Sequence, residues 1–182
     1  CATTYYLLGM SVFDAISHSF STVALGGFST HDASLGYFNN AAIETIAIVF
    51  MLLAAVNFGL HFQTARTFRQ KHYKASLLHY WRDEEFRFFL SVMAIISFIT
   101  VATLWLTNDM TLNDSFRQGV FEVVSIATTT GYATADFALW PPMLGFLLFS
   151  AAFMGGCAGS TGGGMKVVRV LIVLKQGLRE IQ

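Results

Sequence analysis

The chain has 182 residues, of which 54% are hydrophobic and only 12% are charged, and its formal net charge is zero. Soluble domains carry about 25% charged residues, so this composition indicates a protein of the lipid bilayer. The absence of net charge gives no electrostatic reason to expect nucleic acid as a partner. The chain begins with Cys1 and has no signal-peptide pattern, so we interpret it as an internal part of a longer protein.

The first segments predict the end of one helix and then a re-entrant helix. Cys1–Met10 is short and apolar, and Ser11–Val23 has apolar residues at helical spacing. At about 1.5 Å per residue the second segment reaches only about 20 Å, less than the roughly 30 Å of membrane hydrocarbon. Because Gly26-Gly27 follows, we expect the chain to enter the membrane and turn back. Such backbone is tolerated there only inside protein or beside water.

Two segments of membrane length enclose a polar connector. Ala41–Phe62, with Glu44 near one end as its only charge, and Phe88–Leu106, with no charge, are both predicted to span the membrane. Residues 66–86 form the connector. Six of the eleven Lys and Arg residues lie in or next to it, so we expect it to face the cytoplasm. They are Arg66, Arg69, Lys71, Lys74, Arg82 and Arg87.

The second half of the chain predicts the same order of elements. Thr107–Ser115 is a polar outer loop with Asp109 and Asp114, and Phe116–Thr128 is a second short helix. Phe137–Met165 is uncharged but is interrupted by glycines. Four basic residues follow it and belong on the cytoplasmic side: Lys166, Arg169, Lys175 and Arg179. Arg117, on the outer side, is the one exception to this charge asymmetry.

An internal repeat relates the two halves at an offset of 104 residues. The matched pairs are Ser21 with Ser125, Gly27 with Gly131, Phe28 with Tyr132, Thr30 with Thr134 and Asp32 with Asp136. Each half has a short apolar helix before the matched stretch and a long apolar segment after it. The repeated unit is therefore an outward helix, a re-entrant short helix, a glycine loop and an inward helix.

The glycine loops are candidate ion-binding segments. Backbone carbonyls can replace the hydration shell of K⁺ without a fixed charge that would trap it. Glycine can adopt positive φ and so lets consecutive carbonyls point the same way, while the C-terminal ends of the short helices favour a cation. The predicted ligands are carbonyls of Ala24, Leu25, Gly26 and Gly27 in the first loop, and of Thr128, Thr129, Thr130 and Gly131 in the second.

Each of these features also has a plainer interpretation. Short strings of Thr and Gly are common turns. Asp32 and Asp136, predicted at the pore mouth, can equally be solvated loop acids. His18 and Glu122 fall at equivalent positions on the short helices, where they either bond a neighbouring repeat behind the loops or are polar groups satisfied by packing.

A glycine-rich segment interrupts the last long apolar stretch. Six glycines in ten residues disfavour a helix, because each costs up to about 1 kcal/mol relative to Ala. A flexible loop in the conduction pathway, acting as a gate, fits this composition. A phosphate-binding loop fits poorly, because Met165 separates the last Gly from Lys166 and Val167 takes the Ser/Thr position. The predicted gate residues are Gly155, Gly156, Gly159, Ser160, Thr161, Gly162, Gly163 and Gly164.

Three stretches carry a family resemblance: STVALGGFSTHDAS at 21–34, SIATTTGYATADF at 125–137 and GGCAGSTGGGMKVVRVLIVLKQG at 155–177. The chain resembles membrane subunits of the Trk/Ktr/HKT potassium transporter superfamily, most closely the bacterial Trk-type uptake proteins. The resemblance implies an all-α integral membrane fold, a pore of four non-identical helix–pore loop–helix repeats, and an intramembrane gating loop. Residues 1–65 would hold most of the second repeat, residues 66–86 a cytoplasmic connector and residues 87–182 the third repeat.

The resemblance also implies what such a protein does. It implies K⁺ uptake across the cytoplasmic (inner) membrane by a multi-pass homodimer in contact with lipid and with a cytosolic nucleotide-binding regulatory subunit. It implies no cofactor, no nucleic acid and no enzymatic activity, with K⁺ as the transported ion. Channel-like flow and H⁺- or Na⁺-coupled symport both stay open, as do the alternatives of a non-conducting structural subunit and a membrane enzyme.

Overall fold

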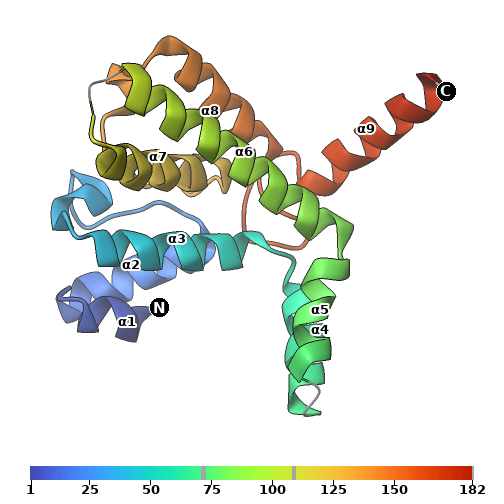
Figure 1. Ribbon diagram of the computed structural model, residues 1–182. Coiled ribbons are helices and arrows are strands. Elements are labelled where there is room, and N and C mark those ends of the chain that lie inside the picture. The colour runs from blue at the N-terminus through green and yellow to red at the C-terminus, as the bar shows by residue number, and fades with distance from the viewer. Residues whose placement is uncertain (71–72, 108–109, 182) are drawn as a thin grey trace.

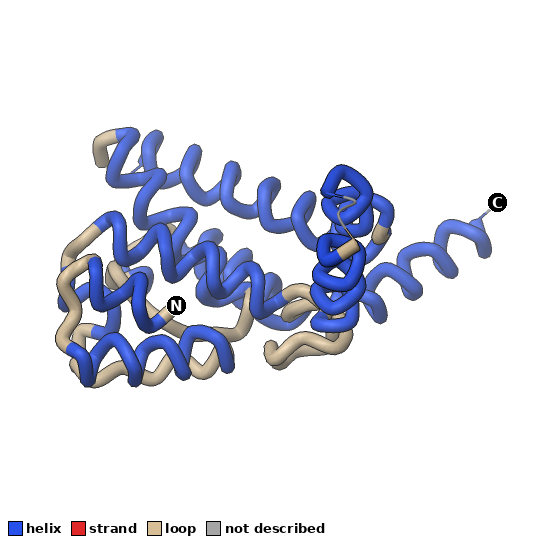
Figure 2. Tube along the Cα trace, turned by 90° about the horizontal axis from the view of Figure 1, so that it is seen from below, coloured by secondary structure: helices blue, strands red, loops and turns tan. Residues whose placement is uncertain are grey.

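The computed structural model describes residues 1–70, 73–107 and 110–181, and these residues form helices joined by loops (Figure 1, Figure 2). Lys71 and Asp109, assigned above to the connector and the outer loop, lie outside the described residues. The helices in chain order are α1 (Ala2–Leu7), α2 (Val12–Ala24), η1 (Ser34–Phe38), α3 (Ala41–Ala55), α4 (Phe58–Arg69), α5 (Tyr73–Arg82), α6 (Glu84–Thr107), α7 (Leu112–Ala127), η2 (Phe137–Leu139), α8 (Pro142–Met154) and α9 (Val167–Ile181).

Two units of the predicted kind are visible in the arrangement of the helices. In the first, α1 packs on α2 and α2 on α3; in the second, α6 packs on α7 and α7 on α8. The contact between α3 and α7 joins the units, and α9 extends away from both (Figure 1). The short helices predicted at 11–23 and 116–128 are present as α2 and α7, the latter beginning four residues earlier.

Helix α6 is long and apolar enough to cross a membrane, and within the described residues it is the single unbroken helix of which this is true. Its 24 residues correspond to about 36 Å at the usual rise. It begins four residues before the predicted span, because the Asp83 carboxylate accepts a hydrogen bond from the Phe86 N–H at 2.7 Å and caps the helix. Glu84 and Glu85 in its first turn also favour a start there.

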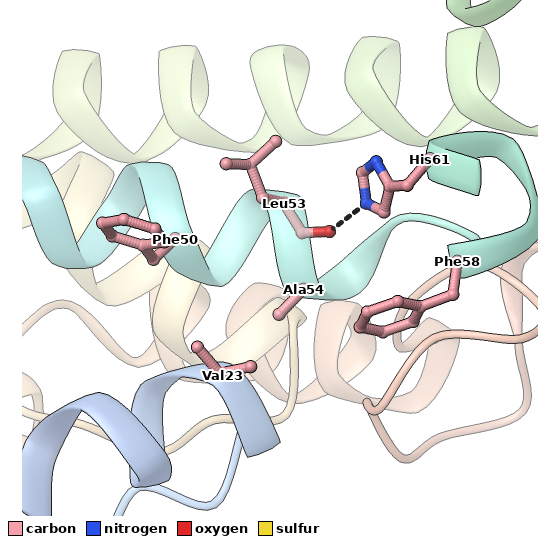
Figure 3. A pocket seen from close by; sticks show the side chains of 6 residues that line it. All are labelled: Val23, Phe50, Leu53, Ala54, Phe58 and His61. Carbon is pink, nitrogen blue, oxygen red and sulfur yellow. Dashed lines mark hydrogen bonds between the residues drawn. The ribbon is translucent and has the colours of Figure 1, made fainter. Parts of the chain in front are cut away.

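The predicted continuous span at 41–62 is wrong, because the chain bends by 98° between α3 and α4. Asn57 starts the new helix by accepting a hydrogen bond from the Gly59 N–H at 2.8 Å. His61 Nε2 lies 2.8 Å from the Leu53 carbonyl oxygen, a group that the break leaves without its helical donor. Figure 3 shows this bond beside an apolar pocket of about 270 Å³ at the bend.

The region predicted as a polar connector contains a helical hairpin. Helices α4 and α5 pack on each other and project from the two units (Figure 1). Thr67 Oγ1 lies 3.1 Å from His79 Nε2, and the Tyr80 hydroxyl lies 2.7 Å from His61 Nδ1. The hairpin is therefore anchored to the bend between α3 and α4.

An ion pair explains the one exception to the charge asymmetry. Arg117 on α7 donates from Nε and Nη2 to the two carboxylate oxygens of Glu44 on α3, both at 2.7 Å. Its Nη2 also donates to Asn39 Oδ1 at 3.0 Å. The Glu44 side chain is only 4% exposed. This bidentate pair therefore joins the two units. The position of Arg117 is determined by its partner Glu44 and not by the charge asymmetry across the membrane.

We predict that Arg117→Met in the full-length protein lowers the free energy of unfolding by about 3 kcal/mol, because it leaves Glu44 buried and unpaired. Adding Glu44→Gln should recover most of the loss, since the double variant contains no unpaired charge. Thermal unfolding in detergent measures both effects. Arg66→Met, at an exposed position of α4, is the control. Equal losses in the single and the double variant would contradict the role of the pair.

Candidate functional site

The first glycine loop, Ala24–Gly27, leaves the end of α2. Ser11 caps the start of α2 by accepting a hydrogen bond from the Asp14 N–H at 3.1 Å. At the other end Leu25 is left-handed, with φ 53°, and the Gly26 N–H donates to the Ser21 carbonyl at 2.8 Å. These features turn the chain sharply back at the helix end.

The second glycine loop, Thr128–Gly131, turns in the same way at the end of α7. Thr129 is left-handed, with φ 63°, and the Thr130 N–H donates to the Ser125 carbonyl at 2.9 Å. Gly27 and Gly131 then follow with φ 68° and 84°. The offset of 104 residues therefore relates backbone conformations and hydrogen bonds as well as residue types. A positive φ is strained for the β-branched Thr129, which makes this turn unusual.

A polar side chain on each short helix holds the segment that follows its loop. His18 Nε2 lies 3.0 Å from Ser29 Oγ, and Glu122 Oε1 accepts hydrogen bonds from the backbone N–H groups of Thr134 at 2.7 Å and Ala135 at 3.1 Å. Both side chains are buried. Each of these partners belongs to the same unit as its short helix, which agrees with polar groups bonded locally, whereas Glu122 Oε2 is buried with no hydrogen-bond partner among the described residues.

The structure brings the two glycine loops into direct contact. A Cβ at Gly27 would overlap the Thr130 carbonyl oxygen and lie 3.0 Å from the carbonyl carbon, so only glycine fits there. A Cβ at Gly131 would meet nothing within 4 Å. The first loop thus lies against the second, while the second loop has an open side in this part of the chain.

Tyr132, directly after the second loop, anchors it to the first unit. Its hydroxyl donates to the His18 carbonyl at 3.2 Å and lies 3.3 Å from Thr22 Oγ1, which in turn lies 3.0 Å from the Tyr5 hydroxyl. Tyr5, Thr22 and Tyr132 are all buried. This chain of hydroxyl groups fixes the relative positions of the two loops, and the repeat alignment with Phe28 gave no sign of it.

The glycine-rich segment, Gly155–Gly164, lies against both glycine loops. The Gly163 N–H donates to Thr129 Oγ1 at 2.7 Å, and Thr161 Oγ1 donates to the Val23 carbonyl at 3.0 Å. Gly162 is buried, and a Cβ there would lie 3.0 Å from the Thr128 carbonyl oxygen. The predicted gate residues and the predicted ion-binding residues therefore form one continuous site.

The same segment is also held by the break between α3 and α4. The Cys157 N–H donates to the Ala55 carbonyl at 2.8 Å, and the Phe58 N–H donates to the Gly159 carbonyl at 3.1 Å. The Glu85 carboxylate accepts from the N–H group of Ala158, inside the segment, at 2.7 Å and from that of Val168, in the first turn of α9, at 3.0 Å. Glu85 had been assigned only to the polar connector, because its partners lie more than seventy residues away.

Asp32 and Asp136 line one shallow hollow of about 430 Å³ formed by the segments that follow the two glycine loops. Both residues are exposed. Asp136 Oδ1 accepts a hydrogen bond from the Ala138 N–H at 3.0 Å and so caps η2. The structure thus brings the two predicted mouth residues to one surface, and it gives Asp136 a local structural role as well.

Paired short helices that end in contacting glycine loops define the class of membrane proteins built from helix–pore loop–helix units. Comparison with known proteins supports this class. Residues 1–182 match the TrkH family, described as cation transport proteins. The chain is 55% identical over 181 residues to the Trk system potassium uptake protein TrkH of Halomonas elongata and 48% identical over 187 residues to that of Escherichia coli K12. Each match covers 100% of this chain and 36% of the relative.

A solved structure agrees with the sequence matches. The crystal structure of the potassium transporter TrkH from Vibrio parahaemolyticus superposes with a TM-score of 0.92 at 49% identity, covering 100% of this chain and 38% of that one. The chain therefore belongs to the TrkH family, and its all-α membrane fold of repeated helix–pore loop–helix units is confirmed. The relatives are transporters rather than enzymes. The chain spans about a third of their length.

We predict that Gly27→Ala destabilises the full-length protein by about 3 kcal/mol, because the added methyl group overlaps the Thr130 carbonyl and the residue keeps a positive φ. Gly145→Ala is the control: that glycine lies within α8 and its Cβ would meet nothing within 4 Å. This change should be neutral or stabilising. Thermal unfolding in detergent measures both, and equal tolerance at the two sites would show that the loops are not in close contact.

Proposed function

We propose that the full-length protein takes up K⁺ across the cytoplasmic membrane and that this chain supplies half of its selectivity filter and a gate. The observation that carries the proposal is the contact between Gly27 and the Thr130 carbonyl, at the ends of two helices with matching turns. The names of the relatives, which are potassium uptake proteins, support the choice of ion.

The proposed filter consists of the backbone carbonyls of Ala24–Gly27 and Thr128–Gly131. Carbonyl oxygens replace the water ligands that K⁺ loses on dehydration, and the C-termini of the two short helices add a favourable electrostatic potential for a cation. The open side of Gly131 leaves room for the two further loops that the missing repeats would supply. Asp32 and Asp136, which share a hollow formed by the segments that follow the two loops, would raise the cation concentration at the pore mouth.

The proposed gate is the glycine-rich segment, Gly155–Gly164. It lies against the second loop at Thr129 and against the first at Leu25, so an ion that leaves the filter on this side meets it first. Its glycines allow a new backbone conformation at small cost in steric strain. Both oxygens of the buried Glu44 carboxylate are occupied by Arg117, which favours channel-like flow over a proton relay through this residue.

The full-length protein is proposed to be a multi-pass homodimer of the inner membrane, with a cytosolic nucleotide-binding regulatory subunit. The relatives belong to Trk systems, which supports a partner of this kind. The basic α4–α5 hairpin and α9 would face the cytoplasm under the positive-inside rule. The division into repeats at residues 1–65 and 87–182 joined by residues 66–86 belongs to the same proposal.

Uptake of radioactive Rb⁺ by cells deficient in K⁺ uptake tests the filter. We expect Gly131→Ser in the full-length protein to lower Rb⁺ uptake by about tenfold or more and to weaken the preference for Rb⁺ over Na⁺, because the change disturbs the carbonyl array. Gly177→Ser on α9, where a Cβ meets nothing within 4 Å, is the control at equal membrane abundance. Unchanged uptake and preference would show that the filter is assigned to the wrong residues.

A deletion tests the gate. Removing Gly162–Gly164 withdraws the bond from the Gly163 N–H to Thr129, so the basal Rb⁺ flux should rise several-fold. Flux into liposomes that contain the purified protein measures this without the regulatory subunit. Wild-type flux in a correctly folded deletion variant would show that the segment is not the gate.

A further inference from the structure

Lys166 follows the glycine-rich segment, and its side chain folds back onto it. The ammonium contacts the Gly162 carbonyl oxygen and lies 3.5 Å from the Ser160 carbonyl oxygen and 3.4 Å from Ser160 Oγ. An ammonium group has three donors and no acceptor, so three oxygens match its hydrogen-bonding capacity. The three oxygens form what we call the Ser160–Gly162 cradle.

The backbone position of Lys166 is unfavourable in two ways. Its φ is 73°, in the left-handed region that L-residues other than glycine seldom adopt. It also directly precedes the first residue of α9, where the helix dipole repels a positive charge. The contacts between the ammonium and the cradle have to offset both costs, which indicates that they are a substantial part of the stability of this conformation.

The cradle lies where the segment meets the glycine loops. Gly162 is buried, and a Cβ there would approach the Thr128 carbonyl oxygen and the Leu25 side chain at 3.0 and 3.2 Å. Glu85 bonds other positions, at the N–H groups of Ala158 in the segment and Val168 in α9. Lys166 therefore fixes the part of the segment that closes on the loops, while Glu85 fixes Ala158 and the start of α9.

We propose that the Ser160–Gly162 cradle is a binding site for a monovalent cation and that its occupant in this conformation is the Lys166 ammonium. Carbonyl and hydroxyl oxygens are also the ligands that a dehydrated K⁺ takes. Lys166 is thus a tethered cation that keeps the segment closed, and its departure leaves the same oxygens free for K⁺. The expected effect on flux rests on the proposed function, but the cation site itself does not.

Two measurements on the full-length protein test the proposal. We expect Lys166→Gln to increase hydrogen–deuterium exchange of residues 155–166 and basal Rb⁺ flux, each by about tenfold, through loss of the charge-assisted bonds. Lys166→Arg, which keeps the charge, should stay near wild type. Lys175→Gln is the matched control, because Lys175 lies on α9, which Lys166 directly precedes, but pairs with Glu84 outside the segment.

The identity of the ligand is tested in the Lys166→Gln variant. Replacing N-methylglucamine chloride by KCl at equal ionic strength should restore part of the exchange protection of the segment, because K⁺ then occupies the empty cradle. In the wild type the same replacement should give no added protection, because the ammonium already fills the site. No effect of K⁺ on the variant would overturn the cation site.

The outcomes separate this inference from the gate. Faster exchange with unchanged flux would mean that Lys166 holds the segment but that the segment is not the gate, so the proposed function would fail alone. Unchanged exchange in Lys166→Gln, in a protein whose Gly162–Gly164 deletion raises flux, would overturn the role of Lys166 and leave the gate intact. Faster exchange in Lys175→Gln as well would show a general loosening of α9 and would also overturn it.

Discussion

The structure depends on the satisfaction of backbone groups where helices stop at membrane depth. In lipid, each N–H or C=O freed by a break needs a partner inside the protein. The breaks in this chain supply partners to one another: the end of α3 at Ala55 accepts from Cys157, and Phe58 donates to Gly159. The glycine-rich segment is tolerated because another irregular stretch lies against it. Neither break would be stable alone in the bilayer.

The same constraint links the glycine loops to the segment beside them. A short helix that ends inside the membrane leaves carbonyls such as that of Val23 without a helical donor, and Thr161 provides one. Thr129, which takes a strained conformation, has its hydroxyl bonded by the Gly163 N–H. A movement of the segment therefore exposes polar groups of both loops. The conformation of the loops and the position of the segment are energetically coupled for this reason.

The sequence predicted the elements whose signals are local. The presence of the two short helices, the turns at Gly27 and Gly131 and the long apolar helix α6 follow from periodicity, glycine and charge. The bend after Ala55 was missed, because the segment from 41 to 62 is mostly apolar and contains no proline. Asn57 caps the new helix locally, but the bonds that pair the break with the glycine-rich segment, from Cys157 to Ala55 and from Phe58 to Gly159, are tertiary.

Parts of the site were beyond prediction for the same reason. The carboxylate of Glu85 acquires its role from partners that the fold brings together, not from neighbours in the sequence. It accepts from the N–H groups of Ala158 and Val168, and the positive ammonium of Lys166 donates to the carbonyls of Ser160 and Gly162. Each group complements the exposed ends of peptide dipoles, so a segment too rich in glycine to be a stable helix is held by charge. Because such contacts are few and discrete, the segment is suited to two defined positions rather than a continuum, which is the property that a gate requires.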